Sequence, residues 1–410
     1  MAATAIPVDT IPSIDPATGK ILAQFAKTPP SALPEILMRA RAAQSAWCGK
    51  PIERRCSQLR VLRDCLMVSR GVLADAVVAE SGKPRAEALF ADLFVALDTA
   101  EYFSKHGARL LRPERVPHHS TAAKAKSGRL VYEPVGIIAI ISSWNYPLAI
   151  PLSQIIPAIA AGNAVVCKTS DFTPQCGALI EKLFADAGFP KNLVTLIQGG
   201  GEVGQALIDA APDKVMFTGS VATGRRVAEA CAKKLIPSVL ELGGKDAMIV
   251  LADANLDVAA SAAVWGSYTN CGQVCLSVER LFVEMSVEEK FLALCVEKTK
   301  KLRLGPGGDP SSDVGPLIRP QHVQRMNDLV NDAMARGARI LCGGKPRPDL
   351  GENFFEPTVL AGVDSSMKLF QEETFGPILA VQSTKDAEEA VARANDSPFA
   401  LAASVWTSDA

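Results

Sequence analysis

The chain has 410 residues, of which 48% are hydrophobic and 21% charged. This is the composition of a globular protein, and the length predicts two or three domains. Lys and Arg number 43 against 44 Asp and Glu, so charge favours neither nucleic acid nor an anionic membrane as a partner. The ten cysteines form no evenly spaced frame, which disfavours a secreted disulfide scaffold and predicts a reduced, cytoplasmic location. Residues 1–15 lack a basic region followed by an apolar run, so we expect no secretory signal.

The first third of the chain has mainly helical periodicity. Leu59, Leu62 and Leu66 recur at the spacing of one helix face, with polar or basic residues between them. Residues 105–129 then hold seven Lys or Arg and a single acid, Glu114. A polyanion site is one interpretation of this stretch. Because no aromatic residues are interleaved, a solvated connector or exposed hairpin is the better one.

Residues 134–167 form a run of 34 residues without a formal charge, long enough to cross a bilayer. Four prolines interrupt the run, and in lipid they would leave backbone groups without hydrogen-bond partners. We therefore predict buried protein core with a strand, a turn, a helix and a second strand, at Val135–Ile141, Ser142–Pro147, Leu148–Ala161 and Ala164–Lys168.

Strand and helix patterns alternate from there onward. This alternation predicts an α/β fold in which crossover helices connect parallel strands and cover both faces of the sheet. Further strands are expected at Leu193–Gln198, Lys214–Thr218, Pro237–Leu240 and Met248–Leu251, and further helices near Val287–Leu302 and Arg319–Arg336. The glycine pair Gly243-Gly244 follows a strand and marks the most plausible domain boundary.

Two glycine loops could bind a phosphate. Gly199, Gly201 and Gly204 form G-x-G-x-x-G between a strand and a helix, the context of a dinucleotide site. The acidic residue expected about 20 positions later is absent, so a simple tight turn is an equal alternative. Phe217-Thr218-Gly219-Ser220 also follows a strand, and its serine begins a helix. That serine could help to bind a phosphate or could be an ordinary N-cap.

A carboxylate and two cysteines are the remaining candidates. Glu241 precedes the glycine pair at the end of a strand, where ligands bind in open α/β sheets, although a lone glutamate is more often a salt-bridge partner. Cys271 and Cys275 do not have redox C-x-x-C spacing, and the four histidines are too distant in sequence to indicate zinc. We expect no metal site. A buried, inert thiol remains the general alternative for either cysteine.

Taken together, the motifs resemble those of the aldehyde dehydrogenase superfamily, and the resemblance extends from about residue 13 to the last residue. The glutamate–glycine motif and the cysteine motif are the most specific. The matching segments are Trp144-Asn145-Tyr146-Pro147, Lys168-Thr169-Ser170-Asp171, Phe217-Thr218-Gly219-Ser220, Glu241-Leu242-Gly243-Gly244-Lys245, Gly272-Gln273-Val274-Cys275 and Glu372-Glu373-Thr374-Phe375-Gly376-Pro377.

The resemblance implies an α/β architecture with a Rossmann-type cofactor domain and an α/β catalytic domain. The cofactor domain is expected at 1–115 and 135–243, a protruding oligomerisation hairpin at 116–134, and the catalytic domain at 244–410. The family normally continues well beyond the position of Ala410, so we expect the catalytic domain to be incomplete at its C-terminal end, with an unpaired apolar sheet edge. A homodimer or homotetramer is expected if that end is present.

The resemblance also implies the chemistry. Cys275 is expected to attack a small-molecule aldehyde, with the oxyanion held by the Asn145 amide and the Cys275 backbone N–H. Glu241 is expected to activate the water that hydrolyses the resulting thioester. NAD or NADP is the expected cofactor. Lys168 and Glu373 are expected to contact its two riboses, Ser220 its pyrophosphate and Phe375 its nicotinamide, with Trp144, Asp171, Gly219 and Leu242 also at the cofactor site. The loop at Gly199 is then peripheral, nearer the adenosine.

Three residues depart from the family pattern. Ser143 replaces the proline before Trp-Asn, which predicts a looser turn that keeps the Asn145 amide. Asp171 replaces a glutamate, and a carboxylate there should repel a 2′-phosphate, which favours NAD. Asp246 stands where Asn or Ser is usual, with no consequence that the sequence reveals.

Three functions remain open. The first is a hydrolytic aldehyde dehydrogenase, and the second is a coenzyme A-acylating enzyme, which Glu241 disfavours because that branch generally lacks this base. The third is an inactive, truncated family member acting only as a binding or structural protein. Lys234 to Pro237 and Ser277 to Arg280 are similar to a bacterial group called succinate-semialdehyde dehydrogenases, so that aldehyde is an alternative specific substrate.

Overall fold

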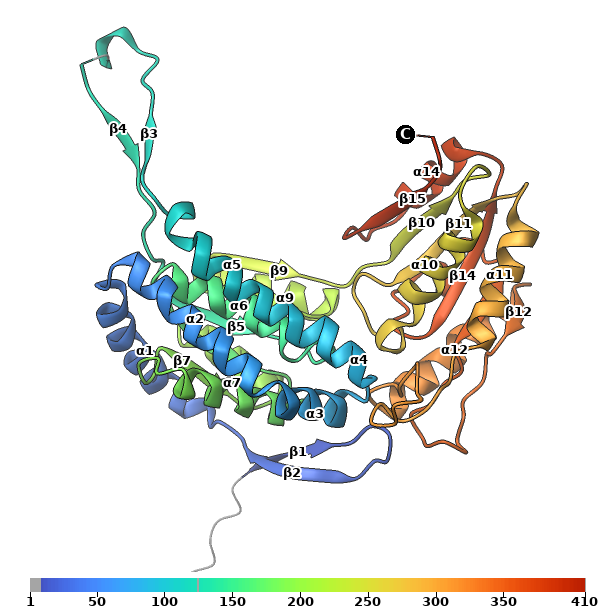
Figure 1. Cartoon of the computed structure of the whole chain (residues 1–410), viewed down its shortest axis with the longest axis horizontal. Coiled ribbons are helices and arrows are strands. Elements are labelled where there is room, and N and C mark those ends of the chain that lie inside the picture. Colours follow the sequence, from blue (N-terminus) through green and yellow to red (C-terminus); the bar gives the residue numbers. More distant parts are fainter. Residues whose placement is uncertain (1–8, 124, 410) are drawn as a thin grey trace, which may run out of the picture. The chain divides into compact units, whose positions relative to one another are not determined.

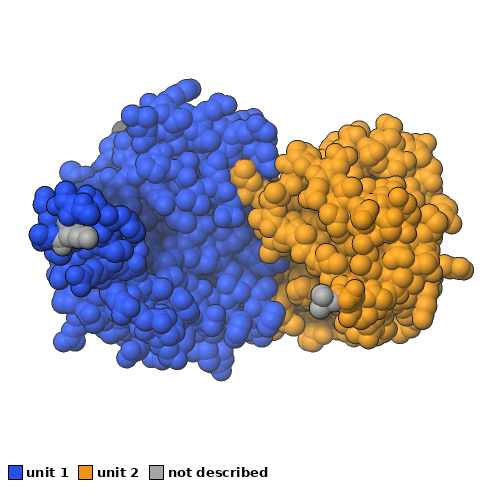
Figure 2. All heavy atoms as spheres, turned by 90° about the horizontal axis from the view of Figure 1, so that it is seen from above, with its two compact units in different colours: residues 1–13, 23–76, 89–241 blue, residues 14–22, 77–88, 242–410 orange. Residues whose placement is uncertain are grey.

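The computed structural model describes residues 9–123 and 125–409. The chain forms two compact units (Figure 2), unit 1 with residues 1–13, 23–76 and 89–241 and unit 2 with residues 14–22, 77–88 and 242–410. Residues 14–22 and 77–88 lie within the range expected for the cofactor domain but belong to unit 2. The expected absence of a secretory signal rests partly on residues 1–8, which lie outside the described residues.

Unit 1 is built on a five-stranded, wholly parallel sheet with the order β7-β6-β5-β8-β9. Its strands are β5 (Ile137–Ile141), β6 (Ala164–Lys168), β7 (Val194–Ile197), β8 (Lys214–Thr218) and β9 (Ser238–Glu241). Every residue of β5 and β6 is buried, as expected for apolar runs in a sheet covered on both faces, although the last residue of β6 is Lys168. The predicted parallel α/β arrangement is confirmed, with strand ends within two residues of those expected.

Helices connect these strands and cover the sheet (Figure 1). The crossover helices are α6 (Ala149–Ala160), α7 (Pro174–Asp186), α8 (Gly201–Asp209) and α9 (Val221–Lys233). The N-terminal helical elements are η1 (Pro30–Ala32), α1 (Leu33–Cys48), α2 (Ile52–Val68), α3 (Arg70–Ser81), α4 (Arg85–Glu87), the π-helix η2 (Ala88–Phe94) and α5 (Val95–Leu110). Trp47 of α1 donates to the carbonyl of Ile159 at 2.8 Å, and Arg55 of α2 donates to that of Ala160 at 3.1 Å. Both bonds tie the N-terminal helices to the end of α6.

Two hairpins complete the N-terminal half. β1 (Thr10–Ile14) and β2 (Ile21–Ala26) pair across a turn in which Gly19 has φ +70°. This hairpin was not predicted, although Asp-Pro-Ala-Thr-Gly is a typical turn sequence. β3 (Glu114–Val116) and β4 (Gly128–Leu130) pair antiparallel, with η3 (Thr121–Ala123) between them, and extend away from α5 (Figure 1). The basic stretch therefore comprises the end of α5 and an exposed hairpin, and the hairpin begins two residues before the range expected for it.

Unit 2 contains a six-stranded mixed sheet with the order β12-β13-β14-β11-β10-β15, in which only β12 and β13 are antiparallel. Its strands are β10 (Asp246–Val250), β11 (Val278–Glu284), β12 (Arg339–Cys342), β13 (Thr358–Ala361), β14 (Ile378–Thr384) and β15 (Ala403–Trp406). Its helices are α10 (Leu256–Tyr268), η4 (Thr269–Gly272), α11 (Glu288–Lys300), α12 (Pro320–Ala335), α13 (Lys368–Gln371) and α14 (Ala387–Asn395). The two predicted helices, α11 and α12, are confirmed.

β15 is the edge strand of this sheet. It pairs with β10, and within residues 9–123 and 125–409 no strand pairs with its other side. Val405 is largely exposed there, which agrees with the expected apolar edge. In the same part of the chain, no helix combines the length and apolar character needed to cross a membrane.

Candidate active site

The candidate residues of unit 1 gather at the carboxyl edge of its sheet. β5 and β8 are neighbours in the sheet, but the chain leaves β5 toward β6 and β7 and returns to the other side with β8. Strand order therefore reverses between β5 and β8, and open α/β sheets bind ligands outside such a switch point. Trp144 and Asn145 follow β5, and Gly219 and Ser220 follow β8. The register also places Glu241, at the end of β9, beside Thr218.

The turn after β5 holds Asn145 in a fixed orientation. Asn145 is buried, and the Ser143 hydroxyl donates a hydrogen bond of 2.8 Å to its Oδ1. That bond turns the amide nitrogen, which is the donor expected for an oxyanion, away from Ser143. Ser143 therefore restrains Asn145 directly, an effect that the sequence comparison with the family did not reveal.

Replacing Ser143 with alanine should lower kcat roughly three- to tenfold, the effect of losing one hydrogen bond of about 1 kcal/mol that orients a donor. The affinity for the cofactor should not change. Steady-state kinetics and a cofactor titration measure the two quantities separately. Ser153→Ala is the matched control, because Ser153 is an exposed serine on α6 whose hydroxyl bonds only its own helix backbone. Equal kcat values for Ser143→Ala and the wild type would contradict a role for this hydroxyl.

The end of β6 carries a buried lysine. Lys168 donates to the carbonyl of Thr169 at 3.0 Å, and its side chain packs against Gly204 of the G-x-G-x-x-G loop. Burial lowers the pKa of Lys168, and the nearby charges of Asp171 and Glu202 partly oppose that shift. The G-x-G-x-x-G segment thus lies against Lys168. Trp144 stacks on Phe172 with ring centroids 6.0 Å apart.

Ser220 is the N-cap of α9. Its hydroxyl oxygen accepts from the Thr223 backbone N–H at 3.3 Å, so the capping interpretation is correct. Capping and anion binding are compatible, because the first turn of a helix has four backbone N–H groups without intrahelical partners. A β-carbon on Gly219 would collide with the Phe217 ring, which explains a glycine at this position.

The nucleophile candidate of unit 2 follows a strained segment. Asn270, Cys271 and Gly272 have φ values of +52°, +57° and +70° in succession. A left-handed conformation costs an L-residue roughly 1–2 kcal/mol, so surrounding contacts must hold these residues. A β-carbon on Gly272 would collide with the carbonyl oxygen of Gly376, which leaves room for glycine alone.

The Gln273 side chain supplies much of that support. It is fully buried, and its amide nitrogen donates to the carbonyl of Asn270 at 3.0 Å. Its amide oxygen accepts from the Ile318 N–H at 2.9 Å. Gly272 and Gln273 of the cysteine motif therefore fix the backbone that leads to Cys275.

The glycine pair brings the cysteine and the distant Glu373 together. A β-carbon on Gly243 would collide with the Glu373 carboxylate, and one on Gly244 would collide with the Cys275 carbonyl oxygen. The Gly244 backbone N–H acts to lower the pKa of the Glu373 carboxyl. Both glycines are thus needed for close packing. They contact Cys275 and Glu373, which are about 100 positions apart in sequence.

Cys275 is a half-buried thiol whose pKa is raised above its usual value near 9. Burial is the main cause, and the charges of Asp246 and Glu373 add to it, while the backbone N–H groups of Cys275 and Leu276 oppose it. Asp246 therefore affects the candidate nucleophile. Its Oδ1 accepts from the Ala402 N–H at 3.0 Å, and burial raises its pKa to about 6.

The segment Glu373–Phe375 has the features of a polar binding loop. Among the described residues, none donates a hydrogen bond to the buried Oε1 of Glu373. Burial, followed by the charge of Glu279, raises the pKa of Glu373 to about 7. A buried acceptor without a partner suits a ligand hydroxyl, such as that of a ribose.

The structure therefore places the candidate residues in two groups. Unit 1 holds Asn145, Trp144, Lys168, Asp171, Gly219, Ser220 and Glu241, and unit 2 holds Leu242, Cys275, Glu373 and Phe375. The sequence alone gave no reason to include Ser143, Asp246 or the buried Glu279 in either site. Within the ranges that the structure describes, no group of three or more His, Cys, Asp or Glu could hold a metal ion.

Comparison with known proteins agrees with this architecture. Residues 4–410 match the family model described as the aldehyde dehydrogenase family. A protein named as a "putative" NADP(+) succinate-semialdehyde dehydrogenase from Mycolicibacterium smegmatis is 40% identical over 369 residues, covering 90% of this chain and 71% of that protein. The 4,4'-diapolycopene aldehyde oxidase of a Methylomonas species is 38% identical over 401 residues, 98% of this chain and 74% of that protein. The NAD+ complex of aldehyde dehydrogenase from Bacillus cereus superposes with a TM-score of 0.93 at 30% identity, covering 98% of this chain and 81% of that one.

The chain belongs to the aldehyde dehydrogenase family, whose enzymes oxidise aldehydes with NAD or NADP. The resemblance identified from the ordered motifs is confirmed, as is the mixed α/β fold. The relatives in this comparison are named for different aldehydes and for NADP or NAD+, so family membership alone leaves both preferences undecided.

Proposed function

We propose that this protein oxidises an aldehyde to a carboxylic acid, with Cys275 as the nucleophile and Glu241 as the base for hydrolysis. The observation that carries the proposal is the close packing of the glycine pair, Gly243 against the Glu373 carboxylate and Gly244 against the Cys275 carbonyl oxygen. The backbone of the candidate nucleophile and a buried acceptor without a partner, Glu373 Oε1, therefore pack against the same two residues. A thiol beside a polar binding loop is the arrangement required for covalent catalysis next to a bound cofactor.

The chain's own residues would act in sequence on the aldehyde. The Cys275 sulfur bonds to the carbonyl carbon while its proton passes to a base, and the oxyanion is stabilised by the Asn145 amide and the Cys275 N–H. Bound NAD or NADP supplies the acceptor for the hydride that this carbon loses. The thioester on Cys275 is then attacked by water, Glu241 takes the water's proton, and the carbon–sulfur bond breaks to restore the thiol.

The raised pKa of Cys275 supports the need for such a base. Burial raises the pKa of the Cys275 thiol above that of an ordinary cysteine, so its proton must be removed as the carbon–sulfur bond forms. Glu241 is an exposed carboxylate on the last residue of β9 and could serve both steps. The same residue favours hydrolysis over transfer of the acyl group to coenzyme A.

The proposed function is tested with an aldehyde panel of succinate semialdehyde, short aliphatic and aromatic aldehydes, each with NAD and with NADP. We expect equimolar acid and reduced cofactor without coenzyme A. A strict requirement for coenzyme A would show that the enzyme transfers the acyl group to coenzyme A and does not hydrolyse the thioester. Absence of turnover, together with absence of a single-turnover burst, would favour a non-catalytic family member. A preference for succinate semialdehyde would support the substrate named for the Mycolicibacterium relative.

We further propose NAD as the preferred cofactor, because two carboxylates, Asp171 and Glu202, influence Lys168 at the end of β6. The negative charge of a 2′-phosphate beside these acids would be repelled.

Asp171→Ala should therefore lower the KM for NADP roughly three- to tenfold while leaving the KM for NAD within about twofold. Initial rates with both cofactors measure the shift. Asp209→Ala, on the exposed end of α8, is the control, and an unchanged NADP/NAD ratio in Asp171→Ala would contradict this assignment.

A further inference from the structure

A buried ion pair in unit 2 lies against the Glu373–Phe375 loop. Lys245 Nζ is 2.8 Å from Glu279 Oε2, and the two side chains are 0% and 2% exposed. The Lys245 ammonium also donates to the Thr374 hydroxyl at 3.3 Å. Neither Lys245 nor Glu279 has a role in the chemistry proposed above.

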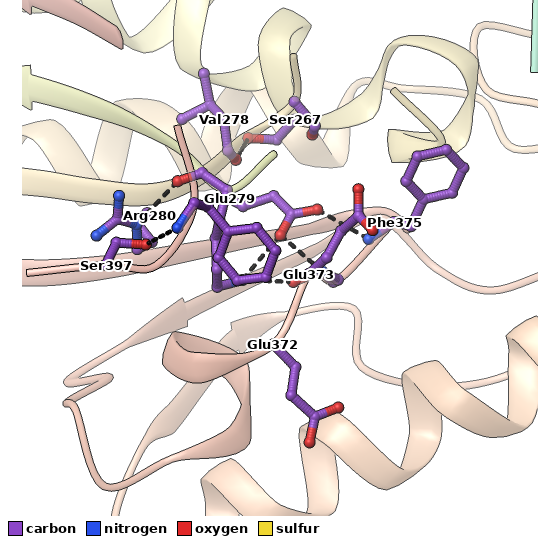
Figure 3. A network of polar contacts seen from close by, with 12 residues as sticks. Ser267, Val278, Glu279, Arg280, Glu372, Glu373, Phe375 and Ser397 are labelled. Atoms are coloured by element: carbon purple, nitrogen blue, oxygen red, sulfur yellow. Dashed lines mark hydrogen bonds and ion pairs between the residues drawn. The ribbon is translucent and has the colours of Figure 1, made fainter. Parts of the chain in front are cut away.

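Glu279 directs its carboxylate at the backbone of this loop. Its Oε2 accepts from the Thr374 N–H at 2.7 Å, and its Oε1 accepts from the Phe375 N–H at 2.9 Å. Figure 3 shows the carboxylate of Glu279 reaching toward the Glu373–Phe375 backbone. One carboxylate therefore holds two consecutive backbone amides and a lysine. Charge-assisted bonds of this kind are about twice as strong as neutral ones.

The loop needs such an anchor because Phe375 is strained. Its φ of +54° is unfavourable for a bulky residue with a β-carbon, and such conformations persist only where neighbouring contacts impose them. The hydrogen bond from the Phe375 N–H to Glu279 restrains the backbone at this strained residue. Without it, the backbone could relax and turn both the Phe375 ring and the preceding Glu373 carboxylate.

The anchor itself is part of the sheet. Glu279 lies on β11, and Lys245 immediately precedes β10. These strands are adjacent and parallel, with Asp246 paired to Val278, so both partners are held by strand register. Arg280 adds a bond of 2.9 Å to the carbonyl of Lys245. The loop conformation is therefore set by the sheet, through side chains that are themselves fully buried.

We propose that Glu279, held by Lys245, is a positioning residue that fixes Glu373 and Phe375 in the conformation that binds the nicotinamide half of the cofactor. The inference rests on the proposed function. It adds a specific requirement that the known motifs do not include, namely a buried carboxylate at residue 279. A merely structural ion pair would instead affect stability without changing cofactor affinity, and buried pairs often contribute little to stability.

The experiment compares Glu279→Gln with Glu372→Gln in the full chain. Glutamine keeps the shape of residue 279 but removes its charge and one acceptor. Glu372 is a matched control, since it lies beside the loop, is paired with Arg325 at 3.2 Å, and directs its carboxylate away from Glu279 (Figure 3). Three quantities are measured for each protein: the Kd for NAD by calorimetry without aldehyde, hydrogen exchange of the peptide that contains residues 374–375, and alkylation of Cys275 by iodoacetamide.

For Glu279→Gln we expect an increase in Kd of at least tenfold, faster exchange in the 374–375 peptide, and alkylation within about threefold of the wild type. Glu372→Gln should match the wild type in all three. A folded Glu279→Gln protein with unchanged Kd and unchanged exchange would overturn the proposal. If this variant does not fold, Glu279→Asp provides the test, since it keeps the charge opposite Lys245 but shortens the reach to the two amides. It should weaken NAD binding as well, and wild-type affinity in Glu279→Asp would also overturn the proposal.

Failure of the proposed function gives a different pattern. A wild-type protein that binds neither NAD nor NADP would contradict the proposed function and, with it, the cofactor role of Glu279. The exchange measurement would still show whether Glu279 holds the loop. Wild-type binding combined with an unaffected Glu279→Gln variant would contradict only the further inference.

Discussion

Replacing Cys275 with alanine is expected to reduce kcat by at least about 10³-fold and to remove the burst of reduced cofactor in the first turnover. No other group in the proposed mechanism can form the thioester, so the loss should not depend on pH or on the aldehyde. Stopped-flow absorbance at the wavelength of the reduced nicotinamide measures the burst. Cys271→Ala is the matched control, because Cys271 lies in the same loop but is fully buried, and burial raises the pKa of its thiol strongly.

The pH dependence of alkylation provides a second measurement on the same residue. In the cofactor-free protein, the raised pKa of Cys275 means that less thiolate is present at neutral pH than for an ordinary cysteine. The alkylation rate should therefore rise about tenfold per pH unit and continue to rise beyond pH 9. If the burst survived in Cys275→Ala but was lost in Cys271→Ala, the nucleophile would be Cys271, and its assignment to Cys275 would be wrong.

Much of the fold could be predicted because its signals are local. β5 and β6 are fully buried, apolar runs in which only the final residue, Lys168, carries a charge, and such runs bounded by turn residues indicate strands covered on both faces. The short, ordered motifs follow strand ends, so knowing the strands already places Asn145, Ser220 and Glu241 at one edge of the sheet. The β1–β2 hairpin was missed because its strands are short, β2 is largely exposed, and one of the two buried residues of β1, Ser13, is polar, which leaves little apolar alternation to detect.

The supporting contacts of the site could not be predicted, because they depend on strand register and on contacts between distant parts of the chain. The hydrogen bond between Glu279 and Phe375 joins residues 96 positions apart in sequence, and the bond between Lys245 and Glu279 joins residues 34 positions apart. Nothing in the composition around residue 279 distinguishes this carboxylate from an exposed one. Ser143 presents a similar difficulty at short range. The sequence shows that it is not proline, but the direction of its hydroxyl depends on the conformation of the turn.

Replacing Glu241 with glutamine should separate the two halves of the reaction. Glutamine has the same shape but cannot accept the proton of the attacking water, and a positioned general base typically contributes 10²–10⁴-fold. We expect the steady-state rate to fall by about 10²-fold or more, while the first turnover still yields reduced cofactor. The acyl group should then remain on Cys275, where mass spectrometry of the quenched protein detects it.

Two additions make this test specific to deacylation. Hydroxylamine needs no base to attack a thioester, so it should restore turnover in Glu241→Gln but not in Cys275→Ala. Glu229→Gln, an exposed carboxylate on α9 of the same unit, should behave as the wild type. If Glu241 also removes the thiol proton, the burst of Glu241→Gln will be slower and its rate will increase with pH as the thiolate forms. An unchanged steady-state rate would show that another group activates the water, and Glu241 would no longer distinguish hydrolysis from acyl transfer.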